Sequence, residues 1–375
     1  MKKILVIVGT RPEAIKLLPL YLELKTNRGC KTLLVSTGQH REMLSVIFNF
    51  FKVVPDFDMN VMTRSQSLEK MTLQLIEKCV DYFKNANPDL IIVQGDTTSS
   101  MTGAVAAFYR RIPVAHVEAG LRSYDKFSPF PEEFNRRVIS LIADFHFAPT
   151  KIAASAIKRE LVRGKILVVG NTVIDSLIFA QKEVIKRKKE LEKKFQFISG
   201  FEKMILITGH RRESFGQGFL NICESITKLA QRYRNIVFLY PVHLNPNVKG
   251  PVFEKLDNIS NVHLIEPVSY DEMVYLMMRS FLIMTDSGGI QEEAPSLGKP
   301  VVILREVSER PEGIKSGCSV LAGTSAKKII RVTKGIIDSE KIYMKMARAV
   351  NPYGSGDSAK KIAGFLNREF IMRGT

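Results

Sequence analysis

The sequence contains no tryptophan, only four cysteines and no apolar run of membrane-spanning length. A transmembrane helix needs about 20 consecutive apolar residues, so we expect a soluble protein without a membrane span. The cysteines lie far apart and lack the spacing of a metal site, which predicts small core residues in a reducing compartment rather than disulfide bonds or a structural metal. They are Cys30, Cys79, Cys223 and Cys318.

We also expect no secretory signal at the start of this sequence. Met1, Lys2 and Lys3 lead directly into an apolar run at residues 4–8 that is typical of a buried strand. No cleavage-site pattern follows this run, as it would in a signal peptide. The expected location of the protein is therefore the cytoplasm.

Positive charge is in excess, with 55 lysines and arginines against 38 acidic residues. Such a balance suits nucleic-acid binding, which gains affinity from phosphate contacts and counterion release. Much of the excess lies in residues 182–194, where basic side chains alternate with Glu183, Glu190 and Glu192 as on a solvated helix face. We therefore expect no nucleic acid as a partner, although the net charge of +17 favours a polyanionic substrate or an anionic membrane surface.

Short β-branched runs alternate with helical patterns along nearly the whole chain, which predicts parallel sheets covered by helices on both faces. With 375 residues, 45% of them hydrophobic, the chain can form two domains with separate cores. We expect two Rossmann-like, doubly wound α/β domains facing across a cleft: residues 1–170, joined by a last helix at 355–375, and residues 171–354. The expected strands are residues 4–8, 31–36, 90–94, 114–117, 145–148, 166–169, 204–208, 236–240, 262–265, 281–284 and 301–304.

The most informative segment is a predicted strand-to-helix turn at residues 286–293, with the sequence DSGGIQEE. Gly288 and Gly289 let the backbone come close to a ligand, and free amides at a helix start attract phosphate. Glu293, one turn later, can accept hydrogen bonds from sugar hydroxyls. A second turn of this kind, at residues 9–16, carries Arg11 and Lys16. Either motif alone also suits a plain strand-to-helix connection with solvated charges.

Ligands of open α/β sheets bind beyond the carboxyl ends of the strands, and unusual polar residues gather at those positions in this sequence. A phosphorylated ligand there would meet cationic side chains as well as the amides of residues 287–290. The cationic residues are Arg11, Lys16, His210, Arg211, Arg212 and Arg310. His243 is a weaker candidate because its proline-flanked segment also suits a rigid loop.

Three carboxylates in the same regions are not explained by phosphate binding: Asp96, Glu118 and Glu132. Carboxylates at such positions suit general acid and base chemistry on a sugar ring. Structural alternatives are open for each of them. Asp96 can be a helix cap, Glu118 a buried ion-pair partner, and Glu132, with Glu133, a favourable acid at a helix start.

Six segments, in order along the chain, resemble the non-hydrolysing UDP-N-acetylglucosamine 2-epimerases of bacteria. The likeness runs from residue 4 to about residue 356. The segments are GTRPEAIK at residues 9–16, GDTT at 95–98, HVEAGLR at 116–122, GHRRESFG at 209–216, PVHLNPN at 241–247 and DSGGIQEEAPSLGKP at 286–300.

The resemblance implies a glycosyltransferase-B-like fold and a homodimer that interconverts UDP-N-acetylglucosamine and UDP-N-acetylmannosamine without an added cofactor. It implies acid and base roles for Asp96, Glu118 and Glu132, with His210 as a further catalytic residue. The UDP-binding residues that it implies are Arg11, Lys16, His210, Ser287, Gly288, Gly289, Glu293 and Arg310, with Glu293 on the ribose. The product feeds bacterial surface polysaccharides such as capsule, and the sequence does not choose among these pathways.

The chemistry of such an epimerisation agrees with the residues present. The hydrogen on carbon 2 is not next to a carbonyl group, so a base removes it only after departure of UDP has created an oxocarbenium-like centre at carbon 1. The product of this step is 2-acetamidoglucal, and addition of the proton to the other face, with return of UDP, gives the epimer. No nicotinamide is needed, and GTRP at residues 9–12 is not a dinucleotide fingerprint.

The sequence departs from the family pattern at two places. Val268 and Met273 occupy a segment where one bacterial branch is expected to carry a glutamine and a phenylalanine near the uracil, so main-chain groups would have to read the base. Glu42 stands where regulated relatives carry glutamine, which leaves open a regulatory second substrate site near residues 39–42 and Arg64.

Two alternatives to a non-hydrolysing epimerase remain. A glycosyltransferase or a hydrolysing epimerase on the same fold would use the same UDP site but pass the sugar to an acceptor or to water. A non-enzymatic basic binding module would show affinity for nucleic acid that falls steeply with salt.

Overall fold

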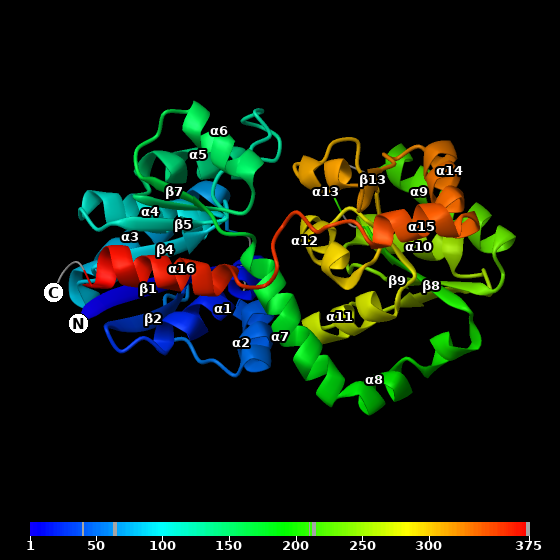
Figure 1. The fold of residues 1–375 in the computed structure, drawn as a ribbon, viewed down its shortest axis with the longest axis horizontal. Coiled ribbons are helices and arrows are strands. Elements are labelled where there is room, and N and C mark those ends of the chain that lie inside the picture. Colours follow the sequence, from blue (N-terminus) through cyan, green and yellow to red (C-terminus); the bar gives the residue numbers. More distant parts are fainter. Residues whose placement is uncertain (40, 63–65, 210, 212–214, 373–375) are drawn as a thin grey trace. The chain divides into compact units, whose positions relative to one another are not determined.

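The computed structural model describes residues 1–39, 41–62, 66–209, 211 and 215–372. This described chain divides into two compact units, one made of Met1–Ser176 with Tyr353–Thr375 and the other of Leu177–Pro352. Each unit has a parallel sheet with helices packed against it (Figure 1). The prediction of doubly wound parallel α/β architecture is confirmed.

The first unit contains, within the described residues, a seven-stranded sheet in the order β3-β2-β1-β4-β5-β6-β7. The order reverses between β1 and β4, the kind of switch point at which open α/β sheets bind ligands. Its strands are β1 (Lys2–Val8), β2 (Cys30–Ser36), β3 (Phe57–Asp58), β4 (Leu90–Gln94), β5 (Val114–Val117), β6 (Phe145–Ala148) and β7 (Lys165–Val168). Its helical segments are α1 (Arg11–Lys25), α2 (Arg41–Phe51), α3 (Leu68–Ala86), α4 (Thr98–Tyr109), α5 (Glu132–Ile142), α6 (Lys151–Arg159), the start of α7 (Thr172–Lys186), α16 (Ser358–Leu366) and η4 (Asn367–Ile371).

The second unit repeats this arrangement with a sheet in the order β10-β9-β8-β11-β12-β13, reversed between β8 and β11. Its strands are β8 (Lys203–Thr208), β9 (Ile236–Pro241), β10 (Val262–Ile265), β11 (Leu282–Thr285), β12 (Val301–Ile303) and β13 (Ser319–Leu321). Its helical segments are α8 (Lys188–Lys194), η1 (Gln196–Gly200), α9 (Gln217–Arg232), α10 (Pro246–Leu256), α11 (Tyr270–Arg279), α12 (Gly288–Glu293), η3 (Ala294–Leu297), α13 (Pro311–Ser316), α14 (Ala326–Asp338) and α15 (Glu340–Ala347).

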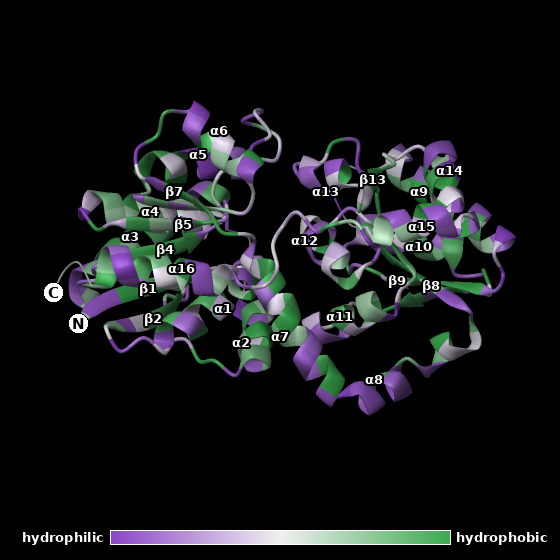
Figure 2. Ribbon diagram, in the orientation of Figure 1, coloured by the Kyte–Doolittle hydropathy of each residue, from purple (hydrophilic) through white to green (hydrophobic). Residues whose placement is uncertain are grey.

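Both cores lie between the sheets and their covering helices. Residues 4–8 of β1 have no exposed surface, as expected of a central parallel strand that is covered on both faces. Figure 2 shows hydrophobic strands inside each unit, whereas α8 is mostly hydrophilic. The four cysteines are buried and free. Among the described residues, no helix is long and apolar enough to span a membrane.

The first unit extends to Ser176 rather than ending at Gly170, because the start of α7 is bonded to it. The Asn171 N–H donates to the Tyr353 carbonyl over 2.6 Å, and the Ser176 hydroxyl donates to the Ile15 carbonyl. The returning chain re-enters this unit at Tyr353. There α16 lies beside α1 (Figure 1), and the Phe365 ring packs edge-on against Phe147.

Candidate active site

Asp96 follows β4 and lies against Arg136 of α5. The Arg136 Nε donates to Asp96 Oδ2 over 3.1 Å, and a second guanidinium nitrogen donates to the same oxygen. Asn135 Nδ2 donates to the Asp96 carbonyl over 2.9 Å. The helix cap at this position is Thr97, whose side chain accepts a hydrogen bond from the Ser100 N–H. The alternative interpretation of Asp96 as a helix cap is therefore wrong.

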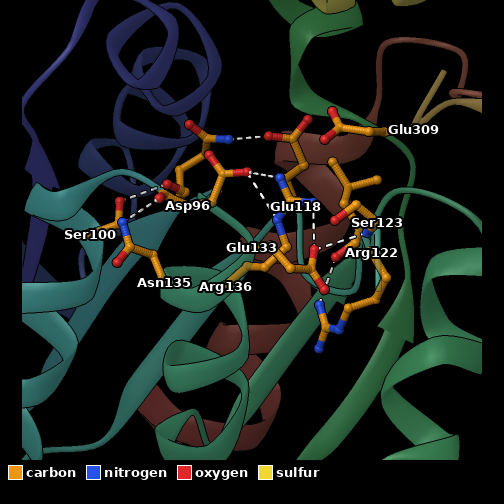
Figure 3. Close-up of polar contacts among 12 residues, drawn as sticks. Asp96, Ser100, Glu118, Arg122, Ser123, Glu133, Asn135, Arg136 and Glu309 are labelled. Carbon is orange, nitrogen blue, oxygen red and sulfur yellow. Dashed lines mark hydrogen bonds and ion pairs between the residues drawn. The ribbon is translucent and has the colours of Figure 1, made fainter. Parts of the chain in front are cut away.

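Arg136 also joins Asp96 to a second carboxylate. Its Nη1 lies 3.1 Å from Oε2 of Glu133, which is fully buried and accepts hydrogen bonds from the Ser123 and Tyr124 N–H groups. Figure 3 shows the Arg136 guanidinium between Asp96 and Glu133. Glu132, the carboxylate that the sequence singled out, is half-buried at the first position of α5. The sequence did not reveal Arg136 as a residue of this site. It lies 40 positions from Asp96 in the sequence and three from Glu133, so no single motif contains all three residues.

Glu118 follows β5 and is surrounded by hydrogen-bond donors. Lys16 Nζ lies 2.5 Å from Glu118 Oε1, and Asn171 Nδ2 donates to the same oxygen over 2.9 Å. Gln94, the last residue of β4, donates to Oε2. Both members of the Lys16–Glu118 pair are buried. Glu118 therefore is a buried ion-pair partner, as one of the structural alternatives predicted. Lys16, which was expected to contact a phosphate, is thus placed on a carboxylate of its own unit.

Glu13 connects the loops that follow β1 and β4. Its Oε2 accepts hydrogen bonds from the Gly9 and Thr10 N–H groups over 3.0 and 2.6 Å. Its Oε1 accepts from the hydroxyls of Thr97 and Ser100 over 2.6 and 2.7 Å. Burial raises the pKa of the Glu13 carboxyl despite these donors. Arg11, at the start of α1, is half-buried beside this connection.

His116 of β5 contacts the backbone of the loop that carries Asp96. It is completely buried, and its Nε2 lies 2.7 Å from the Gly95 carbonyl oxygen. Burial lowers the pKa of His116 to about 3, so the ring is neutral at physiological pH and donates its hydrogen to that carbonyl. This histidine belongs to the HVEAGLR segment, but its role is to hold the backbone next to Asp96.

The second unit brings its predicted residues together at the carboxyl end of β11. Ser287 is the N-cap residue of α12, and its N–H donates to the Thr285 hydroxyl over 2.9 Å. Arg310 is buried, and its Nε donates to Glu292 Oε1 over 2.7 Å. Gly288 makes this packing possible, because a Cβ there would lie 2.5 Å from the Arg310 guanidinium carbon.

Glu293, one turn into α12, is buried and accepts a hydrogen bond from the Tyr270 hydroxyl over 2.7 Å. Tyr270 is the first residue of α11, the helix that also carries Met273. Nearby, Asp286 Oδ2 accepts from the Arg211 N–H over 2.8 Å, which joins the loops after β8 and β11. Tyr270 was not anticipated, because an aromatic residue at a helix start carries no functional signal by itself.

Some of the remaining candidates belong to the described residues and others do not. His243 is exposed, and its Nδ1 accepts from the Asn245 N–H over 3.1 Å, which fits the rigid-loop interpretation. Gln39, in the segment considered for regulation, accepts a hydrogen bond from the Ser99 hydroxyl over 2.7 Å. His40, Arg64, His210 and Arg212 lie outside the described residues.

Comparison with known proteins connects this geometry to one family. A family model described as UDP-N-acetylglucosamine 2-epimerase matches residues 22–367. The UDP-N-acetylglucosamine 2-epimerase of Campylobacter jejuni is 46% identical over 374 residues, which cover 98% of this chain and 97% of that protein. A crystal structure of the Neisseria meningitidis UDP-GlcNAc 2-epimerase bound to UDP-GlcNAc is 44% identical, with a TM-score of 0.94 over 98% of this chain and 100% of that chain.

A more distant structure extends the comparison of folds. A glycosyltransferase from Rickettsia africae, 14% identical, has a TM-score of 0.65 over 100% of this chain and 99% of its own. At that identity the likeness shows the fold alone, and it agrees with the expected glycosyltransferase-B-like architecture. The family model and the near-full-length relatives go further: the chain belongs to the UDP-N-acetylglucosamine 2-epimerase family and is an isomerase.

Proposed function

We propose that the enzyme epimerises carbon 2 of UDP-N-acetylglucosamine reversibly, by eliminating UDP to 2-acetamidoglucal and adding it back. The observation that carries this proposal is the pair of carboxylates at neighbouring strand ends, Asp96 after β4 and Glu118 after β5. Their environments differ, since Asp96 faces a guanidinium and Glu118 faces an ammonium and two amides. Different environments are how enzymes give two carboxylates separate tasks.

The bond between carbon 1 and the diphosphate oxygen breaks, and its electron pair leaves with UDP. A carboxylate takes the proton from carbon 2, and the electrons of that C–H bond form the carbon 1–carbon 2 double bond of 2-acetamidoglucal. In the reverse sequence a proton is delivered to the opposite face of carbon 2 and UDP returns to carbon 1. We assign the acid and base steps to Asp96, Glu118 and Glu132, with Asp96 indispensable.

We assign binding of UDP to the loops at the carboxyl ends of both sheets. Arg11 would supply a charge-assisted contact to the diphosphate, as would Arg310, and Ser287, Gly288 and Gly289 would supply backbone amides. Glu293, already oriented by Tyr270, is suited to the ribose hydroxyls. Lys16 and His210 complete the proposed set. The relative from Neisseria meningitidis that was crystallised with UDP-GlcNAc supports this choice of substrate.

The proposal is tested by a proton NMR time course of the purified protein with UDP-N-acetylglucosamine in deuterium oxide, without added metal, nicotinamide or acceptor. The expected product is UDP-N-acetylmannosamine that carries deuterium at carbon 2. Free N-acetylmannosamine together with UDP would instead identify a hydrolysing enzyme. An unchanged spectrum would overturn the proposal.

We further propose that the enzyme is a homodimer and that its product supplies surface polysaccharide synthesis. Support for the dimer comes from apolar side chains exposed on the neighbouring helices α3, α4 and α5: Leu73, Phe108, Tyr109, Phe134 and Leu141. Such clusters often mark protein interfaces. Light scattering should give twice the mass of 42.3 kDa for the wild type and the single mass for Leu141→Lys. A monomeric wild type would overturn the dimer.

A further inference from the structure

The backbone of Glu118 is held in a conformation that residues other than glycine do not favour. Its φ angle is +61°, in the left-handed region that non-glycine residues rarely occupy and that costs about 1 kcal/mol or more. The residue is nevertheless buried, and its carboxylate accepts from donors in β4, in α1 and in the residue that precedes α7. The surrounding contacts must therefore fix this orientation.

Asn171 is the donor whose position is most completely determined. The side chain is 1% exposed. Its Oδ1 accepts a hydrogen bond from the Val173 N–H over 3.1 Å, and its Nδ2 donates to Glu118 Oε1 over 2.9 Å. The backbone N–H of Asn171 donates to the Tyr353 carbonyl. Rotation of the amide would break the contact to Val173 and the contact to Glu118 together, so the amide has one orientation.

The donors around Glu118 suit an ionised carboxylate. A carboxylate has acceptor capacity only, whereas a protonated carboxyl must also donate. Lys16 and Asn171 share Oε1, while Gln94 binds Oε2, so the two oxygens are anchored from different elements. This arrangement fixes the plane of the carboxylate.

We propose that Asn171 is a positioning residue that holds the Glu118 carboxylate, together with Gln94, in the orientation needed for proton transfer. This inference rests on the proposed acid and base role of Glu118. We infer that Asn171 acts through Glu118 and not on the substrate, because its side chain is buried and its amide donates to that carboxylate. Neither the sequence motifs nor the family likeness had pointed to Asn171.

The decisive variant is Asn171→Asp. The aspartate is nearly isosteric, so the acceptor for Val173 and the backbone bond to Tyr353 are retained while the donor to Glu118 becomes a second carboxylate oxygen. We expect kcat to fall at least about tenfold, since small misplacements of reacting groups are costly. Because two adjacent carboxylates resist simultaneous ionisation, the acid limb of the pH profile should move to higher pH. The affinity for UDP should change less than about twofold.

A matched control is Asn27→Asp. Asn27 also accepts a backbone N–H two positions ahead with its Oδ1 and donates its Nδ2 to another side chain, over 2.8 and 2.9 Å. Its partner is Asn367, not a proposed catalytic residue. This variant should leave kcat and the pH profile unchanged. Asn171→Ser keeps an acceptor for Val173, but its hydroxyl is one bond shorter than the amide that donates to Glu118. This variant should lower kcat without moving the acid limb, and it replaces Asn171→Asp if that variant does not fold.

A double-mutant cycle separates failure of this inference from failure of the proposed function. If Asn171 acts through Glu118, Asn171→Ser should cause no further loss of carbon 2 deuterium exchange in a Glu118→Gln background, so the effects are not additive. Full activity of Glu118→Gln alone would remove the proposed role of Glu118. An inactive Glu118→Gln together with an unchanged kcat and pH profile in both Asn171 variants would overturn the positioning role alone.

Discussion

The two units carry different chemistry at equivalent ends of similar sheets. In the first unit the strand ends collect Asp96, Glu118 and Glu133, each beside a cation or an amide donor. In the second unit the strand end collects the backbone of residues 287–289 and Arg310, which pairs with Glu292, while Glu293 accepts a hydrogen bond from the Tyr270 hydroxyl. The proposed acid and base residues thus lie in the first unit and most of the groups proposed to bind UDP lie in the second, because the loops differ while the strand order is repeated. Four changes test this division, from the largest expected effect to the smallest.

Asp96→Asn should lower turnover about a hundredfold or more, the scale of acid and base contributions, while UDP binding stays nearly intact. The amide keeps the shape of the carboxylate but cannot accept a proton. Steady-state kinetics and calorimetric titration with UDP measure the two effects. Asp125→Asn, in an exposed loop where Asp125 accepts the Phe127 N–H, is the control. An active Asp96→Asn enzyme would remove Asp96 from the acid and base set.

Arg11→Ala should weaken UDP binding about tenfold or more, because a hydrogen bond between charged groups is lost. This change sharpens the comparison of the two units, because weaker binding would show that the first unit, which carries the proposed acids, also contacts the nucleotide. Calorimetric titration with UDP gives the affinity, and Arg28→Ala, at an exposed position after α1, should leave it unaltered. Equal affinity of both variants would put Arg11 outside the UDP site.

Acid should destabilise the first unit through His116. The folded pKa of about 3 lies below the ordinary 6.5, so this group contributes stability that is complete above pH 6.5 and is lost as the pH falls toward 3. Between pH 6.5 and 5 the loss should be about 2 kcal/mol. Urea unfolding across this pH range should show a smaller loss of unfolding free energy for His116→Gln than for the wild type. The exposed variant His243→Gln should lose as much as the wild type. Equal slopes for all three proteins would contradict a neutral buried His116.

Gly288→Ala should weaken UDP binding a few-fold, because the new methyl group displaces the Arg310 guanidinium from Glu292. Gly335→Ala in α14 is the control, since a Cβ there has no atom within 4 Å and the residue is not in the proposed UDP site. Calorimetric titration with UDP compares the two. Tighter binding or no change in Gly288→Ala would show that the Arg310 position does not matter for the nucleotide.

Most of the fold was predictable because buried parallel strands read as short apolar runs. The exceptions, β3 and β13, have two and three residues, and β3 is exposed. Several predicted site residues in the described part of the chain, such as Asp96, Glu118 and Ser287, do lie after strands or at helix starts, because motifs of the form strand, turn and helix are local in the sequence. The contacts among them were not predictable, since Asn171 is 53 positions from Glu118 and Gln94 is 24. Pairing at such separations depends on strand order and register, which residue patterns alone do not fix.

The bonds of Glu13 have a consequence for how a ligand is received. One carboxylate fastens the turn after β1 to the turn after β4, with two backbone amides on one oxygen and two hydroxyls on the other. Arg11 and Asp96 adjoin these turns, so the proposed diphosphate contact and the proposed acid are held by one set of hydrogen bonds that is formed before any ligand binds. Binding then does not have to order two separate loops, and the conformational entropy that such ordering would cost is already accounted for in the folding of the chain.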